Sequence, residues 1–304
     1  MLTPQDKSKP KIIMTNPIKL FLISVIFSSF YFTTIYAQKE DKSLLYEISG
    51  NGLSTHSYIY GTIHLICKDD FMMTEATKQK FGTSQQVYLE IDMDDPKMMS
   101  EMQKNMMMTD GSTLKTLMLE TDYQTVANFF KDTLKTNIGM MPKMKPFVLA
   151  AFALPKMLSC PTQSYEESFV KMASEQHKEI LGLETVKDQF DAIDKMGMKE
   201  QADLMLVDMV KNWNENKAEF ATMIAHYKSQ DVDLMMEDMT KSKMSNKTFE
   251  KDLLENRNSN WVPKITKIMA EKPTFFAVGA GHLGGEKGVI SLLRKQGFTV
   301  KAVK

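Results

Sequence analysis

The chain has 304 residues, with 38 basic and 38 acidic side chains and 43% hydrophobic residues. This composition is that of a globular protein with one large domain or two small ones. Because the charges balance and no basic stripe is present, nothing in the composition favours a nucleic-acid partner. The 27 methionines are unusual. We expect them to fill an apolar core, because the methionine side chain is flexible. Alternatively, clusters such as Met106–Met108 form an adaptable apolar contact surface.

The N-terminal segment has the features of a secretory signal peptide. Lys11 and Lys19 precede an uncharged, largely apolar stretch from Leu20 to Ala37, and Gln38 opens a polar, charged segment. A basic start, an apolar centre and a small residue before a polar segment are typical of such peptides.

We therefore predict that residues 1–37 are a signal peptide and that 38–304 form an exported domain, either periplasmic or secreted. Met14 would give a signal of more ordinary length if it is the true start. A retained membrane anchor is the alternative, since the stretch approaches spanning length. Membrane contact is expected only in that case, and Gln38 in place of a cysteine argues against a lipid anchor.

The chain contains two cysteines, Cys67 and Cys160. Export to an oxidising compartment favours the pairing of an even number of cysteines, so we predict a disulfide between them. Two unrelated buried thiols are the alternative.

The domain opens with a predicted β-hairpin. Polar and apolar residues alternate from Leu44 to Ser49, the pair Asn51-Gly52 interrupts the alternation, and Tyr58–Tyr60 resume it. Such alternation around a turn is typical of two antiparallel strands.

The rest of the chain alternates between long helical segments and short apolar strands. Helices are expected at 74–81, 96–159 with breaks, 165–176, 187–268 and 286–297. Strands are expected at 87–92, 179–184, 274–279 and 298–303. The segment 147–158 is apolar on every side and too short to span a membrane, which indicates a buried helix. The order predicts a single α/β domain, α+β-like, with an N-terminal β-hairpin, a central mixed sheet and a large helical insertion.

Three glycines near the C-terminus, Gly279, Gly281 and Gly284, match the dinucleotide pattern G-x-G-x-x-G. That pattern requires an acidic residue about twenty positions further on, to bind the ribose. Residues 299–304 contain no acid, and the match lies in the last βαβ unit. The sequence therefore does not predict a nucleotide site.

The same stretch contains one of two G-x-x-H motifs, each placed directly after an apolar strand. Gly61 precedes His64 and Gly279 precedes His282, and we expect Gly61, Gly279 and Gly281 to allow sharp turns. Two further strands end in Glu90 and Glu184. Side chains at the carboxyl ends of neighbouring strands meet in one crevice, so we expect these four to converge. Taken alone, each histidine could be a structural hydrogen-bonding residue and each glutamate a solvated one.

The remaining polar candidates carry less weight. His56, His177 and His226 lie in polar surroundings and are expected at the surface. The acidic cluster at 92–95 lacks the glycine and the closing glutamate of a calcium loop.

The two G-x-x-H motifs, Tyr88-Leu89-Glu90 and the C-terminal stretch 278–300 resemble the TraB/GumN family. That family is related to the Tiki proteins, metal-dependent peptidases that act on Wnt proteins. The stretches 164–189 and 255–261 also resemble the family, so the similarity spans nearly the whole mature chain.

The resemblance implies roles for particular residues. His64 and His282 would be metal-site residues, Glu90 an acidic partner, and Arg257 a basic residue near the site. This chain has Ser164-Tyr165-Glu166 where many relatives have Gly-x-Asp, which leaves the role of that position in doubt.

Two neutral imidazoles and a carboxylate form a three-ligand metal site with one position left for water. A bound metal lowers the pKa of that water, Glu184 is a candidate to accept its proton, and Arg257 could stabilise an oxyanion or bind a substrate carboxylate. We therefore predict a metal-dependent hydrolase, a peptidase acting on a peptide or protein, with zinc, manganese and cobalt not distinguished. The alternatives are a non-catalytic protein that holds a haem-like cofactor or a peptide in the same crevice, and an inactive descendant.

Overall fold

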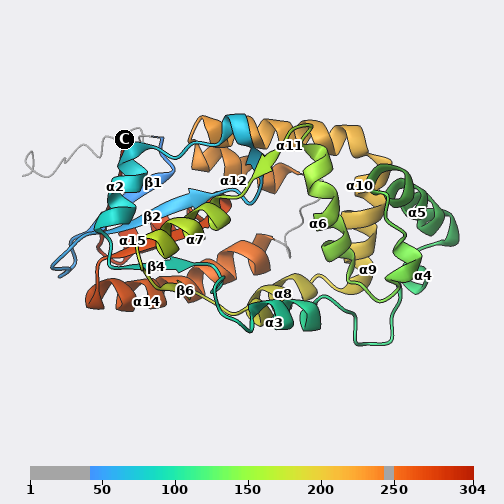
Figure 1. Ribbon diagram of the computed structural model, residues 1–304, viewed down its shortest axis with the longest axis horizontal. Helices are drawn as coiled ribbons and strands as arrows, with labels where there is room; N and C mark the ends of the chain where they lie inside the picture. Colours follow the sequence, from blue (N-terminus) through green and yellow to red (C-terminus); the bar gives the residue numbers. More distant parts are fainter. Residues whose placement is uncertain (1–41, 243–249) are drawn as a thin grey trace, which may run out of the picture. The chain divides into compact units, whose positions relative to one another are not determined.

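A six-stranded mixed sheet, in the order β6-β4-β7-β2-β1-β8, is the central element of the fold (Figure 1). The computed structural model describes residues 42–242 and 250–304, so the predicted signal peptide lies outside the described residues. The strands of this sheet are β1 (Leu45–Ser49), β2 (Ser57–Thr62), β4 (Gln86–Leu89), β6 (Ile180–Gly182), β7 (Thr274–Gly279) and β8 (Thr299–Ala302).

The register of the sheet confirms the predicted hairpin and the mixed topology. β1 pairs antiparallel with β2, and Leu45 lies opposite Tyr60. β8 pairs antiparallel with the other edge of β1 and is therefore an edge strand of the sheet, next to β1. β6, β4, β7 and β2 are all parallel. Their four carboxyl ends therefore lie at one edge of the sheet.

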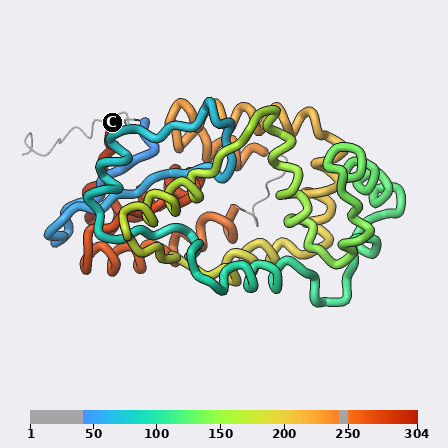
Figure 2. The backbone as a smooth tube through the Cα atoms, in the orientation of Figure 1, coloured from blue at the N-terminus to red at the C-terminus, as the bar shows by residue number. Residues whose placement is uncertain are grey.

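Some helices pack beside the sheet, and others form an insertion that extends beyond it (Figures 1 and 2). Those beside the sheet are α2 (Glu75–Thr83), α7 (Tyr165–Glu175), α14 (Asn256–Glu271) and α15 (Val289–Lys295). Those of the insertion are α3 (Met98–Asn105), α4 (Leu114–Leu117), α5 (Glu120–Leu134), α6 (Pro146–Met157), α8 (Val186–Asp194), α9 (Met198–Gln201), α10 (Met209–Lys211), α11 (Trp213–Lys228) and α12 (Val232–Lys241). Short 3₁₀ segments are η1 (Lys68–Asp70), η2 (Ile138–Met140) and η5 (Ala280–His282), and π-helical segments are η3 (Ala202–Asp208) and η4 (Lys251–Glu255).

The buried hydrophobic residues form two large clusters, and α11 and α12 of the insertion contribute to the one beside the sheet. Beside the sheet, Phe81 from α2 and Phe169 from α7 pack against Tyr60 and Phe275, with ring centroids 5.2–5.7 Å apart for the closest pairs. The second core consists of residues between Met108 and Met209, all from the insertion. Aromatic pairs and apolar burial of this kind stabilise both parts. The predicted single α/β domain with a large helical insertion is confirmed.

Two details differ from the sequence-based expectation. Helix α6 leaves Phe152 46% exposed, so it is not buried on every side. In addition, two short strands that the sequence did not predict, β3 (Ile66–Cys67) and β5 (Thr162–Gln163), form a small antiparallel sheet. Within the described ranges, no helix is long and apolar enough to cross a membrane.

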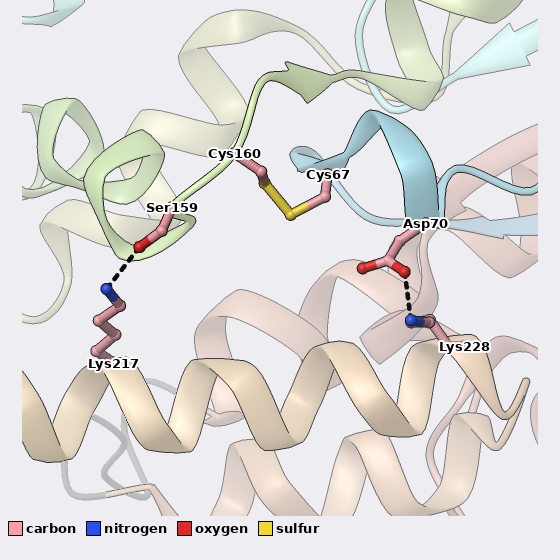
Figure 3. The surroundings of a disulfide bond; sticks show 6 residues. All are labelled: Cys67, Asp70, Ser159, Cys160, Lys217 and Lys228. Atoms are coloured by element: carbon pink, nitrogen blue, oxygen red, sulfur yellow. Dashed lines mark hydrogen bonds and ion pairs between the residues drawn. A yellow bond between two sulfur atoms is a disulfide. The ribbon is translucent and has the colours of Figure 1, made fainter.

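The predicted disulfide joins Cys67 of β3 to Cys160, which lies two positions before β5 (Figure 3). The Cα atoms of the two cysteines lie 5.6 Å apart, an ordinary separation for a disulfide. Helix α11 contacts both linked segments: Lys217 Nζ donates to Ser159 Oγ at 2.8 Å, and Lys228 forms an ion pair with Asp70. The disulfide and α11 thus hold the segment after β2 against the segment that leads into α7.

Candidate functional site

The polar residues that follow the four parallel strands lie at one edge of the sheet. Glu90 follows β4 directly, Glu184 follows β6, His64 follows β2, and His282 ends η5 after β7. These strands are neighbours in the order β6-β4-β7-β2. His64, Glu90 and His282 line one cavity of about 390 Å³, together with Arg257. Glu184 does not line it.

His282 is buried, and its two ring nitrogens have different partners. Nδ1 lies 2.7 Å from Asn258 Oδ1, and the amide group of Asn258 donates to the carbonyl of Lys287. Asn258 Oδ1 is therefore an acceptor, which assigns the proton of the neutral ring to Nδ1. Nε2 keeps its lone pair and accepts from Arg257 Nη1 at 3.1 Å.

Glu90 is held as a carboxylate by donors from three elements. Its Oε1 accepts from the backbone N–H of Gly279 at 2.8 Å, and its Oε2 accepts from Arg257 Nη2 at 2.7 Å and Gln189 Nε2 at 3.0 Å. Burial alone would raise the pKa of Glu90. The charge of Arg257, the nearby histidines and the Gly279 bond outweigh it and lower that pKa to about 2.

Arg257 is the buried cation of the site, and Glu184 is its main partner. Nη2 and Nε of Arg257 donate to Glu184 Oε1 at 2.6 and 3.0 Å, and Nη1 also donates to the Leu253 carbonyl. Trp261 Nε1 donates to the other oxygen of Glu184 at 2.9 Å. The Glu184 side chain is only 5% exposed. Its carboxylate therefore holds Arg257 in place, and its predicted role as a proton acceptor stays a prediction.

His64 has an acidic partner that was not among the predicted site residues. Its Nδ1 lies 3.1 Å from Glu166 Oε1, and the imidazole is 73% exposed, although it faces the cavity. Thr62 Oγ1 and Ser164 Oγ donate to the two oxygens of Glu166 at 2.6 and 2.9 Å. The hydrogen bond and charge of Glu166 raise the pKa of His64 to about 9.

The two histidines therefore share one design. In each, Nδ1 faces an oxygen acceptor, Glu166 or Asn258, whereas Nε2 of His282 accepts from Arg257 Nη1. Acceptors of this kind fix ring orientation in metal-binding histidines. The signal for Glu166 was present in the sequence, at the position where the family has Gly-x-Asp, whereas nothing local marked Asn258.

The glycines of the two motifs lie where neighbouring groups approach too closely for a side chain. Gly61 lies inside β2 and not in a turn, whereas Gly279 precedes the 3₁₀ turn η5 and Gly281 lies in it, and none of the three has a positive φ. A Cβ on Gly61 would lie 2.9 Å from Leu283 Cδ1 and 3.0 Å from Ala280 Cβ, and one on Gly281 would lie 2.5 Å from Met239 Sδ. The missing side chains let η5 approach β2 and α12 closely.

Of the other histidines, His177 is exposed, and His56 is a mainly exposed partner of Glu47. His226 differs from the expectation, because it forms a partly buried ion pair with Asp238 of α12. None of the three lines the site cavity.

The donor set suits a divalent metal ion, but it is not assembled as a complete site. Glu90 Oε1 and His282 Nε2 lie 3.8 Å apart. Two atoms bound to one ion at about 2.0–2.1 Å each can be at most about 4.2 Å apart, so this pair fits. Among residues 42–242 and 250–304, no group of three or more His, Cys, Asp or Glu side chains has the arrangement of a metal site. His64 is turned toward Glu166. That His64, Glu90 and His282 converge on one metal ion stays a prediction.

The burial of His282 predicts a loss of stability in acid. Burial disfavours the charged ring and lowers the pKa of His282 from 6.5 to about 3. Below pH 6.5 the unfolded chain takes up a proton that the folded chain does not, so the free energy of unfolding falls as the pH drops. We expect a loss of about 2 kcal/mol between pH 6.5 and 4.5. Below pH 4.5 Glu90 adds a second loss, since its pKa falls from 4.5 to about 2.

Urea unfolding at a series of pH values measures this loss. The variant His282→Gln should lack the part between pH 6.5 and 4.5, whereas His177→Asn, a change of an exposed histidine with positive φ that asparagine tolerates, should keep it. Equal pH dependence in wild type and His282→Gln would show that His282 is not the group responsible. His64 acts in the opposite direction, since its raised pKa gives stability that is present below pH 6.5 and is lost as the pH rises from 6.5 to about 9.

The protein is thus a mixed α/β protein with two histidines and two carboxylates at one edge of its sheet. The chain matches the TraB/PrgY/gumN family over residues 44–302. Because the match covers most of its length, the chain belongs to this family, and the resemblance seen in the sequence is confirmed.

Several relatives are metalloproteases by name. Metalloprotease TIKI2 of Danio rerio is 20% identical over 87% of this chain and 62% of its own length. The Metalloprotease TIKI homolog of Nematostella vectensis is 23% identical over 82% of this chain and 65% of its own length. The chain spans about three fifths of the length of the curated relatives that it matches. The names link the family to metallopeptidases. No solved structure matches the chain.

Proposed function

We propose that this chain is an exported, metal-dependent peptidase whose site is the cavity at the carboxyl edge of the sheet. One observation carries the proposal: His282 Nε2 and Glu90 Oε1 lie 3.8 Å apart in that cavity, and His64 lies on its wall after the adjacent strand β2. The metalloprotease names of the relatives favour a peptide or protein as the substrate.

In this proposal His64, Glu90 and His282 hold the ion. A divalent zinc, manganese or cobalt ion would supply Lewis acidity and a bound water of lowered pKa. Asn258 and Glu166 orient the two imidazoles through Nδ1, and Gly279 N–H and Gln189 hold the carboxylate of Glu90.

Arg257 would act on the substrate side of the site. Its guanidinium lines the cavity and is kept charged by Glu90 and Glu184, which raise its pKa. A fixed cation there can stabilise an oxyanion or bind a substrate carboxylate. We assign Glu184, together with Trp261, the part of positioning Arg257.

Two features support export. The N-terminal 37 residues have the order of a signal peptide. The disulfide between Cys67 and Cys160 is stable in an oxidising compartment such as the periplasm or the extracellular space. Intact mass of protein recovered from its native host tests this part, since a chain that still contains Leu20 would indicate a retained anchor.

The metal prediction concerns His64 and His282. We expect purified protein to bind about one equivalent of zinc, manganese or cobalt, and His64→Ala and His282→Ala each to weaken that binding at least about 100-fold. Titration calorimetry measures the affinity. Circular dichroism checks the fold, because His282 is buried and its loss leaves a cavity.

Cleavage of a mixed peptide pool, with and without chelator, measures the activity. We expect cleavage only with metal, none above background in either histidine variant, and full binding and cleavage in His177→Asn. Unchanged metal stoichiometry in the double variant His64→Ala/His282→Ala would contradict the site. Peptide or haem binding without metal or turnover would instead favour the non-catalytic alternative.

A further inference from the structure

A second, larger hollow adjoins the site cavity and has a different chemistry. It has a volume of about 600 Å³ and lies among the segment after β2 and helices α6, α11 and α12 with the π-helical segment η3. Its apolar lining consists of Ile63, Leu65, Leu154, Met157, Met205, Phe220, Met223 and Met239. We call this hollow the apolar groove. Thioether and branched apolar side chains adapt readily to apolar ligands of different shape.

The apolar groove is continuous with the candidate site. Ile63, His64, Met223 and Met239 line both the groove and the cavity that contains Glu90 and His282. A chain segment that crosses the cavity beside His64 can therefore place a neighbouring side chain in the groove.

Charged side chains at the rim of the groove already have partners. Asp238 pairs with His226, Lys241 pairs with Glu237 on the same helix, and Glu219 accepts from Ser242 Oγ at 3.2 Å. Asp238 and Lys241 therefore have ionisable partners within the protein, whereas the Glu219 carboxylate has a neutral hydroxyl donor and disfavours an acidic ligand. Selection in the groove then rests on the burial of apolar surface.

We propose that the apolar groove binds large apolar side chains, such as those of leucine, methionine or phenylalanine, from an extended peptide whose backbone crosses the site cavity. The proposal rests on the proposed peptidase function for the identity of the occupant. Extended peptides commonly obtain affinity from the main chain and specificity from pockets that take individual side chains. A groove with this lining should reject aspartate or lysine at the same position, because a charge buried without a partner is costly.

The test measures peptide binding with chelator present, so that hydrolysis does not contribute. The probes are fluorescein-labelled dodecapeptides of alanine and glutamine that carry two leucines at central positions, and matched peptides with two aspartates. Fluorescence anisotropy with the full chain should show at least about 10-fold tighter binding of the leucine peptide.

Two variants of the groove and one control locate this preference. Thr222 lines the groove, is exposed and bonds only within its own helix, so Thr222→Trp should fill the groove without disturbing the fold. Leu154→Asp places a charge in the lining. Both should remove the preference for leucine. Met140→Asp, at an 81% exposed methionine outside both hollows, should keep it.

The outcomes separate this inference from the proposed function. Equal binding of the two peptides by the wild type, or a preference that survives in both groove variants, would overturn the inference. So would a dimer that occupies the groove and that the leucine peptide cannot displace in sedimentation experiments. Failure of the proposed function would appear elsewhere, as an absence of metal binding and cleavage while the leucine preference remains.

Discussion

Arg257→Met is expected to lower the free energy of unfolding by about 3–5 kcal/mol, the usual cost of leaving buried charges without their counter-ion. Arg257 forms ion pairs with Glu90 at 2.7 Å and with Glu184 at 2.6 Å, and all three side chains are at most 12% exposed. Without the guanidinium, two carboxylates remain buried close to each other. Urea unfolding at pH 7 measures the effect, and linear extrapolation gives the free energy.

Two comparisons identify the cause of the loss. Lys187→Met removes an exposed i,i+4 pair with Asp191 and should cost less than about 0.5 kcal/mol. In the double variant Arg257→Met/Glu184→Gln, part of the loss should be recovered, since one of the stranded charges is gone. A loss below about 1 kcal/mol in Arg257→Met would mean that the carboxylates find other partners, and the assignment of Arg257 as the central cation of the site would be wrong.

Removing the disulfide is expected to cost about 4–5 kcal/mol in the chain-entropy account, because the bond closes a long loop. Cys67 and Cys160 are 93 positions apart. The double variant Cys67→Ala/Cys160→Ala should unfold at correspondingly lower guanidinium concentration than the oxidised protein. The wild type under reducing conditions should behave like the variant. A difference below about 1 kcal/mol, or two free thiols in exported protein, would contradict this prediction.

The same variant should also loosen the site, and a second measurement shows it. Cys67 follows His64 by three positions and Cys160 precedes Glu166 by six, with the β3–β5 pair between them. The disulfide thus helps to hold His64 against Glu166. NMR titration of His64 should find its pKa lowered from about 9 toward the ordinary value of 6.5 when the disulfide is absent. An unchanged pKa would show that the ion pair is held by α7 and β2 alone.

Much of the fold follows from local patterns in the sequence. Alternation from Leu44 to Ser49 predicts β1, and the apolar stretches before Glu90 and His282 predict β4 and β7. Short runs of β-branched and aromatic residues bounded by polar ones specify strands without reference to distant segments. The pair β3 and β5 escaped prediction because two residues are too few for any period, and the pairing depends on a partner far along the chain.

The candidate site, too, was predictable in part from local sequence and in part only from the tertiary structure. The sequence by itself determined which residues follow the strands, since His64, Glu90, Glu184 and His282 occupy equivalent local positions. Only the tertiary structure decided which partners each side chain has there. The strand order placed Glu90 and His282 side by side, and packing of α14 brought Arg257 between Glu90 and Glu184. The physical reason is that a strand end fixes where a side chain starts, whereas its partners come from helices that pack against that edge from distant parts of the chain.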